Sequence, residues 1–479
     1  MIRALVLSLI LPMAAPAAPD VLMIAVDDLN DWVGCLGGHP EVRTPNIDAL
    51  AARGVVFANA HCQAPLCNPS RTSLLSGLRP GRTGVYGLAP SIRGVPGFAE
   101  VTLLPGHFRN NGYRTAVGGK LYHAYPAPRF RGRDFDEWGP ECDFGPLPPE
   151  KFIRTPSPLR LVDWGVFPAH DEQQNDRVIA DWAIGRLREP SEKPRLVAVG
   201  FGKPHVPCFA SKKWFDLYPP GSLTMPEVPE DDLADVPPFS RYLHWDLPEP
   251  RLEWLRDSGE WEDLVRAYLA CISYVDSEIG RVLKALDDSG ATANTVVVLW
   301  SDHGWHLGEK GISGKNSLWE RATRVPLIIA GPGIRSGRCE EPVELLDLYP
   351  TLSALAGLPV PEGLDGISLV PQLNNPSTPR ERPAITTANQ GNHAIRDRHW
   401  RYIRYADGSE ELYDHRGDPD EWKNLADVPG HAAEKTRLAK WLPLPDLPPA
   451  PGSAHRILTR DAGGRWIWEG KPIEGKGSR

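Results

Sequence analysis

A short stretch of the chain combines a cysteine, a serine and an arginine, in the order Cys67-Asn68-Pro69-Ser70-Arg71. A cysteine side chain is a starting point for nucleophilic catalysis, and a guanidinium fixed one helical turn later offsets negative charge that develops beside it. The simpler interpretation is a small buried or capping cysteine before a helix, and five residues alone do not exclude it. The choice depends on which other residues the fold brings to Cys67.

Acidic residues follow two apolar runs. Asp27 and Asp28 come at the end of residues 21–26, and Asp302, followed by His303, comes just after residues 295–300. Three carboxylates that converge repel each other strongly unless a cation lies among them. Oxygen ligands suit calcium or magnesium. One such carboxylate would be interpreted as a cap or turn residue, but the whole set favours a metal site.

Lysines and histidines recur in similar positions. Lys120 and His123 lie in Gly-Lys-Leu-Tyr-His, Lys203 and His205 in Gly-Lys-Pro-His, and Lys315 in Gly-Lys-Asn-Ser. Lysines can hold charge that builds on oxygen atoms, and a histidine can protonate a leaving group. A single histidine is more often a structural residue than a catalyst, and Lys203 could simply flank its loop.

Three further residues are weaker candidates. Trp305 could stack on a sugar ring, although core packing is an equally good interpretation in a chain with 16 tryptophans. His393 and Arg396 could reach the site from the C-terminal part of the chain.

The elements that must position these residues alternate between strands and helices. Strands are predicted at residues 21–26, 114–117, 195–201, 295–300 and 325–330, and helices at residues 44–53, 70–78, 260–286 and 344–356. This alternation predicts a mostly parallel sheet covered by helices on both faces. Ligands of such sheets lie beyond the carboxyl ends of the strands. That edge is where the sequence locates Asp27, Asp28, Lys120, His205 and Asp302.

The pattern changes near residue 380. Short strands at residues 399–405 and 410–414 and a helix at 431–441 indicate a small antiparallel subdomain, followed by a Pro-rich extended segment at 442–453. We therefore predict a catalytic domain at residues 18–379 and a C-terminal α+β subdomain at 380–479. Residues 126–168 and 218–250 are predicted to be long surface insertions of the kind that form lids or binding walls.

Composition and charge narrow the class of protein. The chain has 479 residues, 24% charged and 41% hydrophobic, with a net charge of −8 and no long basic run, so nucleic-acid binding is not expected. Residues 1–17 have the pattern of a secretory signal peptide, and no later run is apolar enough to span a bilayer. A periplasmic or secreted protein without stable membrane insertion is expected. The seven cysteines are an odd number, so at least one is unpaired.

The stretch from Cys67 to Arg71, with Thr72 to Gly77 after it, resembles the maturation signal of the type I sulfatases. The resemblance extends from Val21 to about Pro361 and is greatest to the branch that includes iduronate-2-sulfatase and its bacterial relatives. That branch shares the pair Asp302-His303, where asparagine is frequent at the second position elsewhere in the family. One departure is Arg79, which stands one place later than the arginine of the usual signal.

The resemblance implies an alkaline-phosphatase-like fold and a cysteine that a dedicated maturing enzyme oxidises to formylglycine. It implies that the hydrated aldehyde attacks the sulfur of a sulfate ester and then expels the sulfate. It further implies a divalent ion, Ca²⁺ rather than Mg²⁺, held by Asp27, Asp28, the modified Cys67, Asp302 and His303. Lys120 and Lys315 would grip the sulfate, His123 and Arg71 would steady the aldehyde hydrate, His205 would be the general acid, and Trp305 would contact the sugar.

We therefore predict a sulfuric ester hydrolase that acts on a sulfated sugar at the non-reducing end of a glycan, with a 2-O-sulfated uronic acid as the first substrate to try. One alternative is a formylglycine-dependent phosphonate or phosphodiester hydrolase on the same scaffold. The other is a sulfoglycan-binding protein without turnover.

Overall fold

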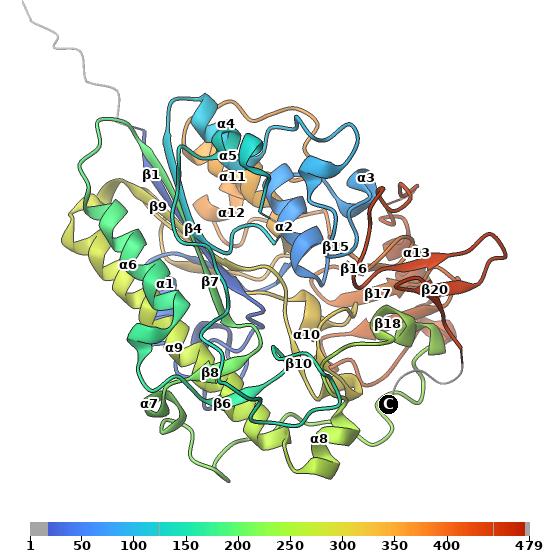
Figure 1. Cartoon of the computed structure of the whole chain (residues 1–479). Coiled ribbons are helices and arrows are strands. Elements are labelled where there is room, and N and C mark those ends of the chain that lie inside the picture. The colour runs from blue at the N-terminus through green and yellow to red at the C-terminus, as the bar shows by residue number, and fades with distance from the viewer. Residues whose placement is uncertain (1–17, 124, 444, 475–479) are drawn as a thin grey trace, which may run out of the picture.

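An eight-stranded sheet forms the centre of the molecule (Figure 1). The structure is a computed structural model that describes residues 18–123, 125–443 and 445–474, so the predicted signal peptide at 1–17 lies outside the described residues. The strand order is β13-β2-β12-β9-β1-β7-β4-β5. The bounds of these strands are Gly337–Cys339, Val55–Phe57, Leu327–Ala330, Thr295–Ser301, Asp20–Asp27, Arg195–Pro204, Arg114–Gly119 and Glu137–Trp138.

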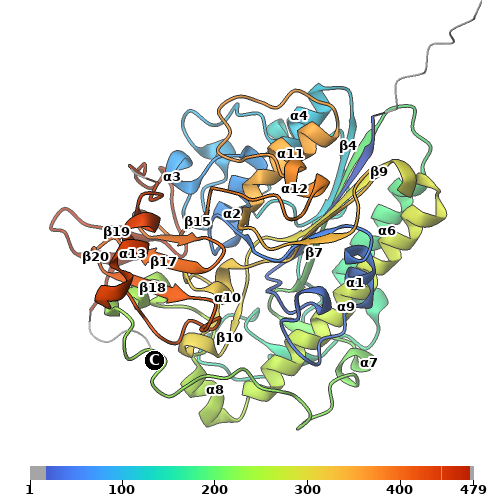
Figure 2. The ribbon, with the colours of Figure 1, turned by 180° about the vertical axis from the view of Figure 1, so that it is seen from behind.

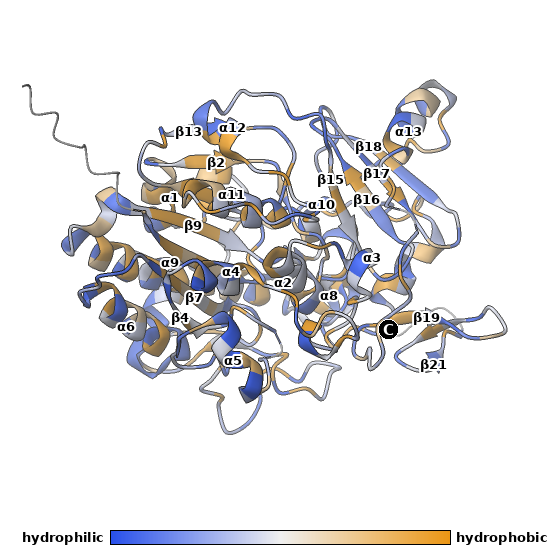
Figure 3. Ribbon diagram, turned by 90° about the horizontal axis from the view of Figure 1, so that it is seen from above, coloured by the Kyte–Doolittle hydropathy of each residue, from blue (hydrophilic) through white to orange (hydrophobic). Residues whose placement is uncertain are grey.

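The sheet is mostly parallel, as predicted. Strand β1 pairs in parallel with β7 on one side and with β9 on the other, and β7 pairs in parallel with β4. The exception is β12, which is antiparallel to both β9 and β2. Central strands such as β1 and β9 are buried on both faces, which explains their nearly continuous apolar sequences (Figure 3).

Helices cover both faces of the sheet (Figures 1 and 2). Alternate residues of β1 point to opposite faces, so Leu22 and Ile24 pack in one apolar cluster while Val21 and Met23 pack in the other. The first cluster includes helices α1, α6 and α9, with bounds Pro45–Ala51, Asn175–Arg188 and Trp261–Asp288. The second includes α2, α4 and α11, with bounds Cys67–Ser76, Leu104–Asn110 and Leu348–Leu355. The predicted α/β fold class is confirmed.

Two smaller antiparallel sheets form the C-terminal part. The first contains β15, β16, β17 and β18 in that order, with bounds Ala384–Thr387, His393–Arg396, Trp400–Arg404 and Glu410–Asp414, and α13 follows at Ala432–Ala439. The second contains β19, β20 and β21, with bounds Leu458–Arg460, Trp466–Trp468 and Lys471–Pro472. The sequence indicated β17, β18 and α13 but neither β15, β16 nor the second sheet. The division at residues 379 and 380 stays a prediction.

Helix α2 begins at Cys67 and not at Ser70 as the sequence suggested. Pro69 is the cause of that difference, because a proline within a sequence is normally interpreted as a break. In the first helical turn, however, the amide groups have no partner inside the helix, so the missing N–H of Pro69 costs nothing there. The predicted helix at 344–356 is likewise divided into a 3-10 turn, Leu345–Asp347, and α11.

The predicted insertions carry short elements of their own. Residues 126–168 contain α5, Pro128–Asp134, as well as β5 and the strand β6, Trp164–Val166. Residues 218–250 contain a 3-10 helix, Pro238–His244. Within the described ranges, no helix has both the length and the apolarity needed to cross a membrane. All seven cysteines fall in these ranges and are free thiols.

Candidate active site

Cys67 occupies the first turn of α2 and is 1% exposed. Four side chains surround its sulfur. Lys315 Nζ lies 3.0 Å from Cys67 Sγ and His303 Nε2 lies 3.3 Å from it, while Asp28 Oδ1 and Lys120 Nζ are each 3.8 Å away. The structure therefore brings together around Cys67 four residues that are distant in sequence and that sequence analysis named as site residues.

Four parallel strands deliver these groups to one edge of the sheet. Strand β1 ends at Asp27, β4 ends just before Lys120, β7 ends just before His205, and β9 ends just before Asp302. The pairing of β1 with β7 becomes irregular between Val26 and Asp27. Asp28 then adopts a left-handed backbone, φ 59°, which is uncommon for a residue other than glycine and occurs where the surrounding structure imposes it.

Arg71 holds the strand ends together from behind the site. Its Nη2 donates to Asp27 Oδ1 at 2.9 Å, its Nε donates to Asp302 Oδ2 at 2.8 Å, and its Nη1 donates to the carbonyl oxygen of Lys120. Lys120 Nζ also pairs with Asp27. Arg71 thus fixes the geometry of the carboxylates, and its expected contact with an aldehyde hydrate stays a prediction.

The carboxylates and His303 form a compact donor set. One potential ligand atom from each of Asp28, Cys67, Asp302 and His303 lies within 4.8 Å of the others, and Asp27, Asp28 and His205 form a second such group. Burial raises the pKa of Asp28 to about 8 even though Lys315 and His303 act to lower it. Lys315 Nζ bonds both oxygens of this carboxylate, at 2.8 and 3.1 Å. The buried Asp28 carboxylate would be stabilised by further positive charge, so these residues fit a divalent cation.

The field at position 67 favours an anion. Burial alone would raise the pKa of the Cys67 thiol, but Lys120, Lys315 and His303 together lower it well below its usual value. Burial would lower the pKa of His303, but Asp302 and Asp28 raise it to about 9. A site with this field can stabilise an attacking oxygen or a sulfate oxygen equally well.

Two further histidines lie beside the site. His205 Nε2 lies 3.7 Å from Asp28 Oδ2, and His205 Nδ1 lies 2.6 Å from the carbonyl oxygen of Val206. Burial and the charges of Lys120 and Lys315 lower the pKa of His205 well below 6.5, so the free enzyme holds it neutral. His123 is half-buried and helps to lower the pKa of Cys67, while its Nδ1 has no hydrogen-bond partner among the described residues.

Phe144 is a site residue that sequence analysis missed. Its ring stacks on the ring of His205 at a centroid distance of 4.5 Å and an interplanar angle of 28°, and Lys120 Nζ lies 4.7 Å from its centroid. Phe144 has a left-handed backbone, φ 58°, and belongs to the predicted insertion at 126–168. The sequence indicated only that long insertions often form the walls of binding sites. That pattern does not distinguish Phe144 from the other aromatic residues of the insertion.

The weaker candidates lie elsewhere or behind the site. Trp305 is 3% exposed, and Lys315 Nζ lies over its ring at 5.5 Å, so the predicted contact with a sugar stays a prediction. Lys203 Nζ donates to the carbonyl oxygen of Pro207. His393 Nε2 lies 3.3 Å from Asp446, and Arg396 Nε donates to Glu320, so neither is brought to Cys67.

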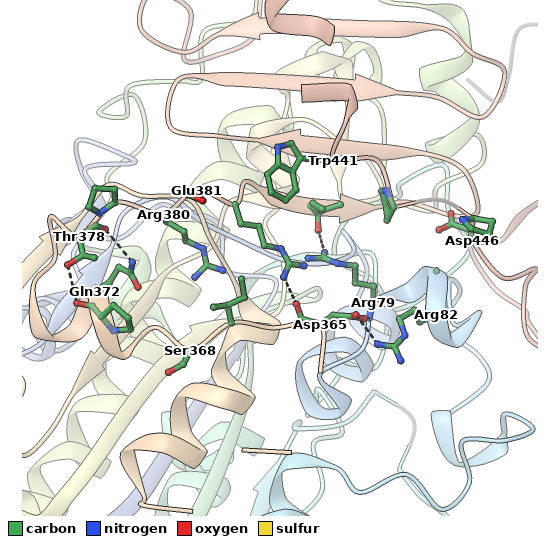
Figure 4. Close-up of a pocket in the computed structure, with 18 residues that line it drawn as sticks. Arg79, Arg82, Asp365, Ser368, Gln372, Thr378, Arg380, Glu381, Trp441 and Asp446 are labelled. Atoms are coloured by element: carbon green, nitrogen blue, oxygen red, sulfur yellow. Dashed lines mark hydrogen bonds and ion pairs between the residues drawn. The ribbon is translucent and has the colours of Figure 1, made fainter. Parts of the chain in front are cut away.

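A separate cavity of about 930 Å³ lies beyond the other end of α2 (Figure 4). Arg79, Arg82 and Arg380 line it, and each is paired inside the protein, with Glu344, Asp365 and Asp347 respectively. Both terminal nitrogens of Arg79 donate to Glu344 at 2.7 Å. These ion pairs tie the chain that follows α2 to its surroundings.

Comparison with known proteins identifies related families. A profile of the family "Sulfatase" matches residues 19–358, and one described as "N-sulphoglucosamine sulphohydrolase, C-terminal" matches residues 308–443. A sulfatase of Formosa agariphila is 43% identical over 425 residues, covering 85% of this chain and 83% of that protein. The mouse iduronate 2-sulfatase is 34% identical over 400 residues, covering 73% and 70%.

A solved structure supports the fold. The phosphonate monoester hydrolase of Silicibacter pomeroyi superimposes with a TM-score of 0.74 at 22% identity, covering 95% of this chain and 100% of that one. At this identity the likeness concerns the fold alone. The family profile and the relatives go further: the chain belongs to the sulfatase family and is a sulfuric ester hydrolase.

Proposed function

We propose that this chain hydrolyses O-sulfate esters of a sulfated sugar, with a formylglycine made from Cys67 and a divalent cation beside it. The observation that carries the proposal is the position of Cys67 at the start of α2, within 3.8 Å of Lys315, His303, Asp28 and Lys120. An unreactive structural cysteine would not require two ammonium groups and two potential metal ligands around its sulfur.

A hydrated aldehyde at position 67 would supply one hydroxyl oxygen for attack on sulfur and a second hydroxyl whose deprotonation releases sulfate. The chain's own residues support both needs. Lys120 and Lys315 lie where they can neutralise the sulfate oxygens, and His123 is the proposed partner that steadies the aldehyde hydrate at position 67. Oxygen acid–base chemistry of this kind is not available to the thiol itself.

His205 is the proposed proton donor to the leaving alkoxide. The free enzyme holds it neutral because it is buried and faces the ammonium groups of Lys120 and Lys315. A bound sulfate anion would offset those two charges and so favour protonation of the imidazole. Stacking on Phe144 fixes the plane of the ring and therefore the direction in which Nε2 points.

The cation would be held by Asp27, Asp28, Asp302, His303 and the modified residue 67, where it supplies positive charge for sulfate oxygens. Calcium is favoured over magnesium, since it accepts roughly six to eight oxygen ligands in irregular geometry whereas magnesium demands a near-ideal octahedron. The donor set includes one imidazole, which both ions tolerate less well than oxygen.

The substrate class is inferred from the relatives. The mouse protein at 34% identity is an iduronate 2-sulfatase, which makes a 2-O-sulfated uronic acid the first substrate to try. Action at the end of a glycan chain is part of the proposal. The phosphonate monoester hydrolase is related only in fold, and a phosphonate ester is therefore the alternative to be tested against.

Maturation requires a second protein. Cys67 is 1% exposed, so an oxidising enzyme must reach it before the chain closes over α2. The conversion replaces the thiol by an aldehyde oxygen with loss of sulfur, and therefore needs an external electron acceptor supplied with that enzyme. We propose that the chain meets this enzyme on its way to a periplasmic or extracellular location.

The test is to express the chain with and without a sulfatase-maturing enzyme and to measure the mass of the Cys67 peptide together with turnover. Matured protein should lose about 18 Da at this peptide and should gain multiple turnover of 4-nitrophenyl sulfate. Cys67→Ser should lower steady-state turnover by roughly a thousandfold or more, because serine has no second hydroxyl for release. Cys35→Ala, a change at a partly exposed cysteine outside the site, is the matched control.

Each arm has an outcome that contradicts the proposal. Full steady-state activity in Cys67→Ser, or in protein whose Cys67 keeps its thiol, would remove the nucleophile assignment. Faster turnover of a phosphonate monoester than of any sulfate ester would favour the alternative hydrolase. Retention of a sulfated glycan by matured protein without sulfate release would favour a binding protein.

A further inference from the structure

The C-terminal segment beyond α13 brings an arginine to the edge of the site. This segment follows both family profiles, which end at residues 358 and 443. Within it, Arg456 adopts a left-handed backbone, φ 58°, and its side chain is 11% exposed. The side chain is thus largely enclosed but keeps some exposed surface, in a part of the chain that the family profiles do not describe.

The partners of Arg456 connect it to the reactive centre. Its Nη1 donates to Asn316 Oδ1 at 2.9 Å, and its Nη2 donates to Glu249 Oε1 and Oε2 at 2.8 and 3.1 Å. Asn316 follows Lys315, and its left-handed backbone, φ 71°, turns the chain between them. Lys315 consequently points to Cys67 while Asn316 points to Arg456.

The path of the segment is fixed by close backbone contacts with residues 84–88, which follow α2. The amide of Ala450 donates to the carbonyl oxygen of Gly84 at 2.9 Å, and the amide of Leu88 donates to that of His455 at 3.1 Å. A Cβ atom on Gly84 would lie 2.7 Å from the carbonyl oxygen of Pro448, and one on Gly87 would lie 2.8 Å from that of His455. Only glycine permits so close an approach.

The same residues are tied to the nucleophile. Asn68, the neighbour of Cys67, donates from Nδ2 to the carbonyl oxygen of Gly87 at 3.0 Å. Direct hydrogen bonds therefore join the start of α2, residues 84–88 and the segment that carries Arg456. Arg456 is built into the site and is not a loosely placed surface residue.

The charge state of the pair indicates the kind of group it would bind. Burial disfavours the charged form of Arg456, but Glu249, Cys67 and Asp28 raise its pKa, so it remains a cation. Glu249 already neutralises it, and a second anion would have to compete with that carboxylate. A hydroxyl group needs one acceptor and one donor side by side, which Glu249 and Arg456 offer together.

We propose that Arg456 and Glu249 bind a ring hydroxyl next to the sulfated carbon, and so determine preference for a sulfated sugar over a simple aryl sulfate. This inference rests on the proposed function and adds a specificity-determining pair to it. Lys315 would hold the sulfate, and the pair of Arg456 and Glu249, which Asn316 connects to Lys315, would hold the neighbouring hydroxyl of the same ring.

The test compares matured wild-type protein with Arg456→Ala on three compounds: methyl iduronide 2-sulfate, its 3-deoxy analogue and 4-nitrophenyl sulfate. The substitution should lower kcat/KM for the sugar by about 10- to 100-fold, chiefly through KM, and should lower the sugar-to-aryl ratio of kcat/KM at least tenfold. Removal of the 3-hydroxyl should cost the wild type a similar factor and should cost Arg456→Ala almost nothing more.

Controls separate this role from a structural one. Arg460→Ala, a change in the same segment at an arginine that lies over Trp466, should leave the ratio unchanged. Arg456→Ala could fail to fold because Glu249 loses its partner. The double variant Arg456→Gln with Glu249→Gln then removes both charges while the two side chains can still hydrogen-bond each other. It should show the same lowered sugar-to-aryl ratio of kcat/KM as expected for Arg456→Ala.

Two outcomes overturn the inference while leaving the proposed function intact. Equal losses on the sugar and the aryl sulfate would make Arg456 structural, and an additional penalty for the deoxy analogue in Arg456→Ala would assign the hydroxyl to other residues. Absence of sulfate release from both esters by the matured wild type would instead contradict the proposed function itself.

Discussion

The site combines two lysine ammonium groups with a neutral imidazole. Lys315 and Lys120 approach the sulfur of Cys67, whereas His205 Nε2 lies 3.7 Å from Asp28 Oδ2 and the His205 ring stacks on that of Phe144. The lysines can stabilise negative charge on the sulfate. Their contacts are with Cys67 and the carboxylates, and none of these contacts assigns them the role of proton donor to the ester oxygen. His205 is therefore the residue whose effect should depend on the leaving group.

We expect His205→Gln to discriminate between leaving groups. A sugar alkoxide needs a proton as it departs, so kcat for methyl iduronide 2-sulfate should fall by about 10²- to 10⁴-fold. Nitrophenolate leaves without a proton, so 4-nitrophenyl sulfate should lose far less. The change appears in kcat, which distinguishes it from the KM effect expected at Arg456.

The control is His399→Gln, at an exposed histidine outside the site, which should leave both rates as they are. Equal losses on the two esters in His205→Gln would show that His205 serves the sulfate or the fold and does not donate the proton.

Helix α2 depends on different interactions at its two ends. Its first turn carries Cys67, and just beyond its last turn Arg79 forms a buried, two-pronged ion pair with Glu344. Glu344 also accepts the backbone amide of Ile385 at 2.9 Å, in the first strand of the C-terminal sheet. The arginine that is displaced relative to the family signal thus has a clear structural partner, whatever its effect on maturation.

Removal of the Arg79 charge should therefore destabilise the protein. Arg79→Met leaves the buried Glu344 with only a longer contact to Arg382, at 3.6 Å, and we expect the free energy of unfolding to fall by about 3 kcal/mol. Arg82→Met is a matched control, since that side chain is 52% exposed and its pairing with Asp365 should contribute no more than about 1 kcal/mol. Urea unfolding measured by tryptophan fluorescence compares the two.

A second variant checks the cause. Arg79→Met combined with Glu344→Gln removes both charges but keeps an acceptor for Ile385, and should recover a large part of the loss. A double variant as unstable as Arg79→Met would assign the effect to packing of the arginine stem.

At the scale of the whole molecule, ion pairs join the catalytic part to the C-terminal sheet. Glu320 pairs with Arg396 and Arg401, on β16 and β17, and Arg401 Nε also lies 2.5 Å from Glu421. Trp319 Nε1 donates to Glu411 on β18 at 2.8 Å. The C-terminal sheet is thus anchored close to the loop that carries Lys315, so global stability and site geometry should change together.

A divalent cation should accordingly stabilise the whole fold. Calcium that binds only the folded site adds about 2.7 kcal/mol at a hundredfold excess over its Kd, so EDTA should lower the thermal midpoint and added CaCl₂ should restore it. Magnesium should restore less. Asp28→Asn should lose most of this response, whereas Asp287→Asn, at a surface pair with Arg53, should keep it. A thermal midpoint that ignores both chelator and calcium would contradict the metal site.

The sequence determined the chemistry at the strand ends. Asp27, Lys120, His205 and Asp302 each follow an apolar run, and parallel strands necessarily bring their carboxyl ends to one edge. The pentapeptide that begins at Cys67 could be recognised directly in the sequence. The fold class could be predicted because the apolar periods of strands and helices are local patterns. The start of α2 was missed, since Pro69 is harmless only in a first turn.

Tertiary structure alone decided which groups cover that chemistry. Phe144 comes from an irregular insertion, and Arg456 and Glu249 lie 207 positions apart in sequence yet share hydrogen bonds. No local pattern distinguishes them, because their roles arise from long-range backbone paths such as the contact of Gly87 with His455. The pairing of Arg79 with Glu344 was hidden likewise: a charge in sequence does not reveal its partner until the chain has folded.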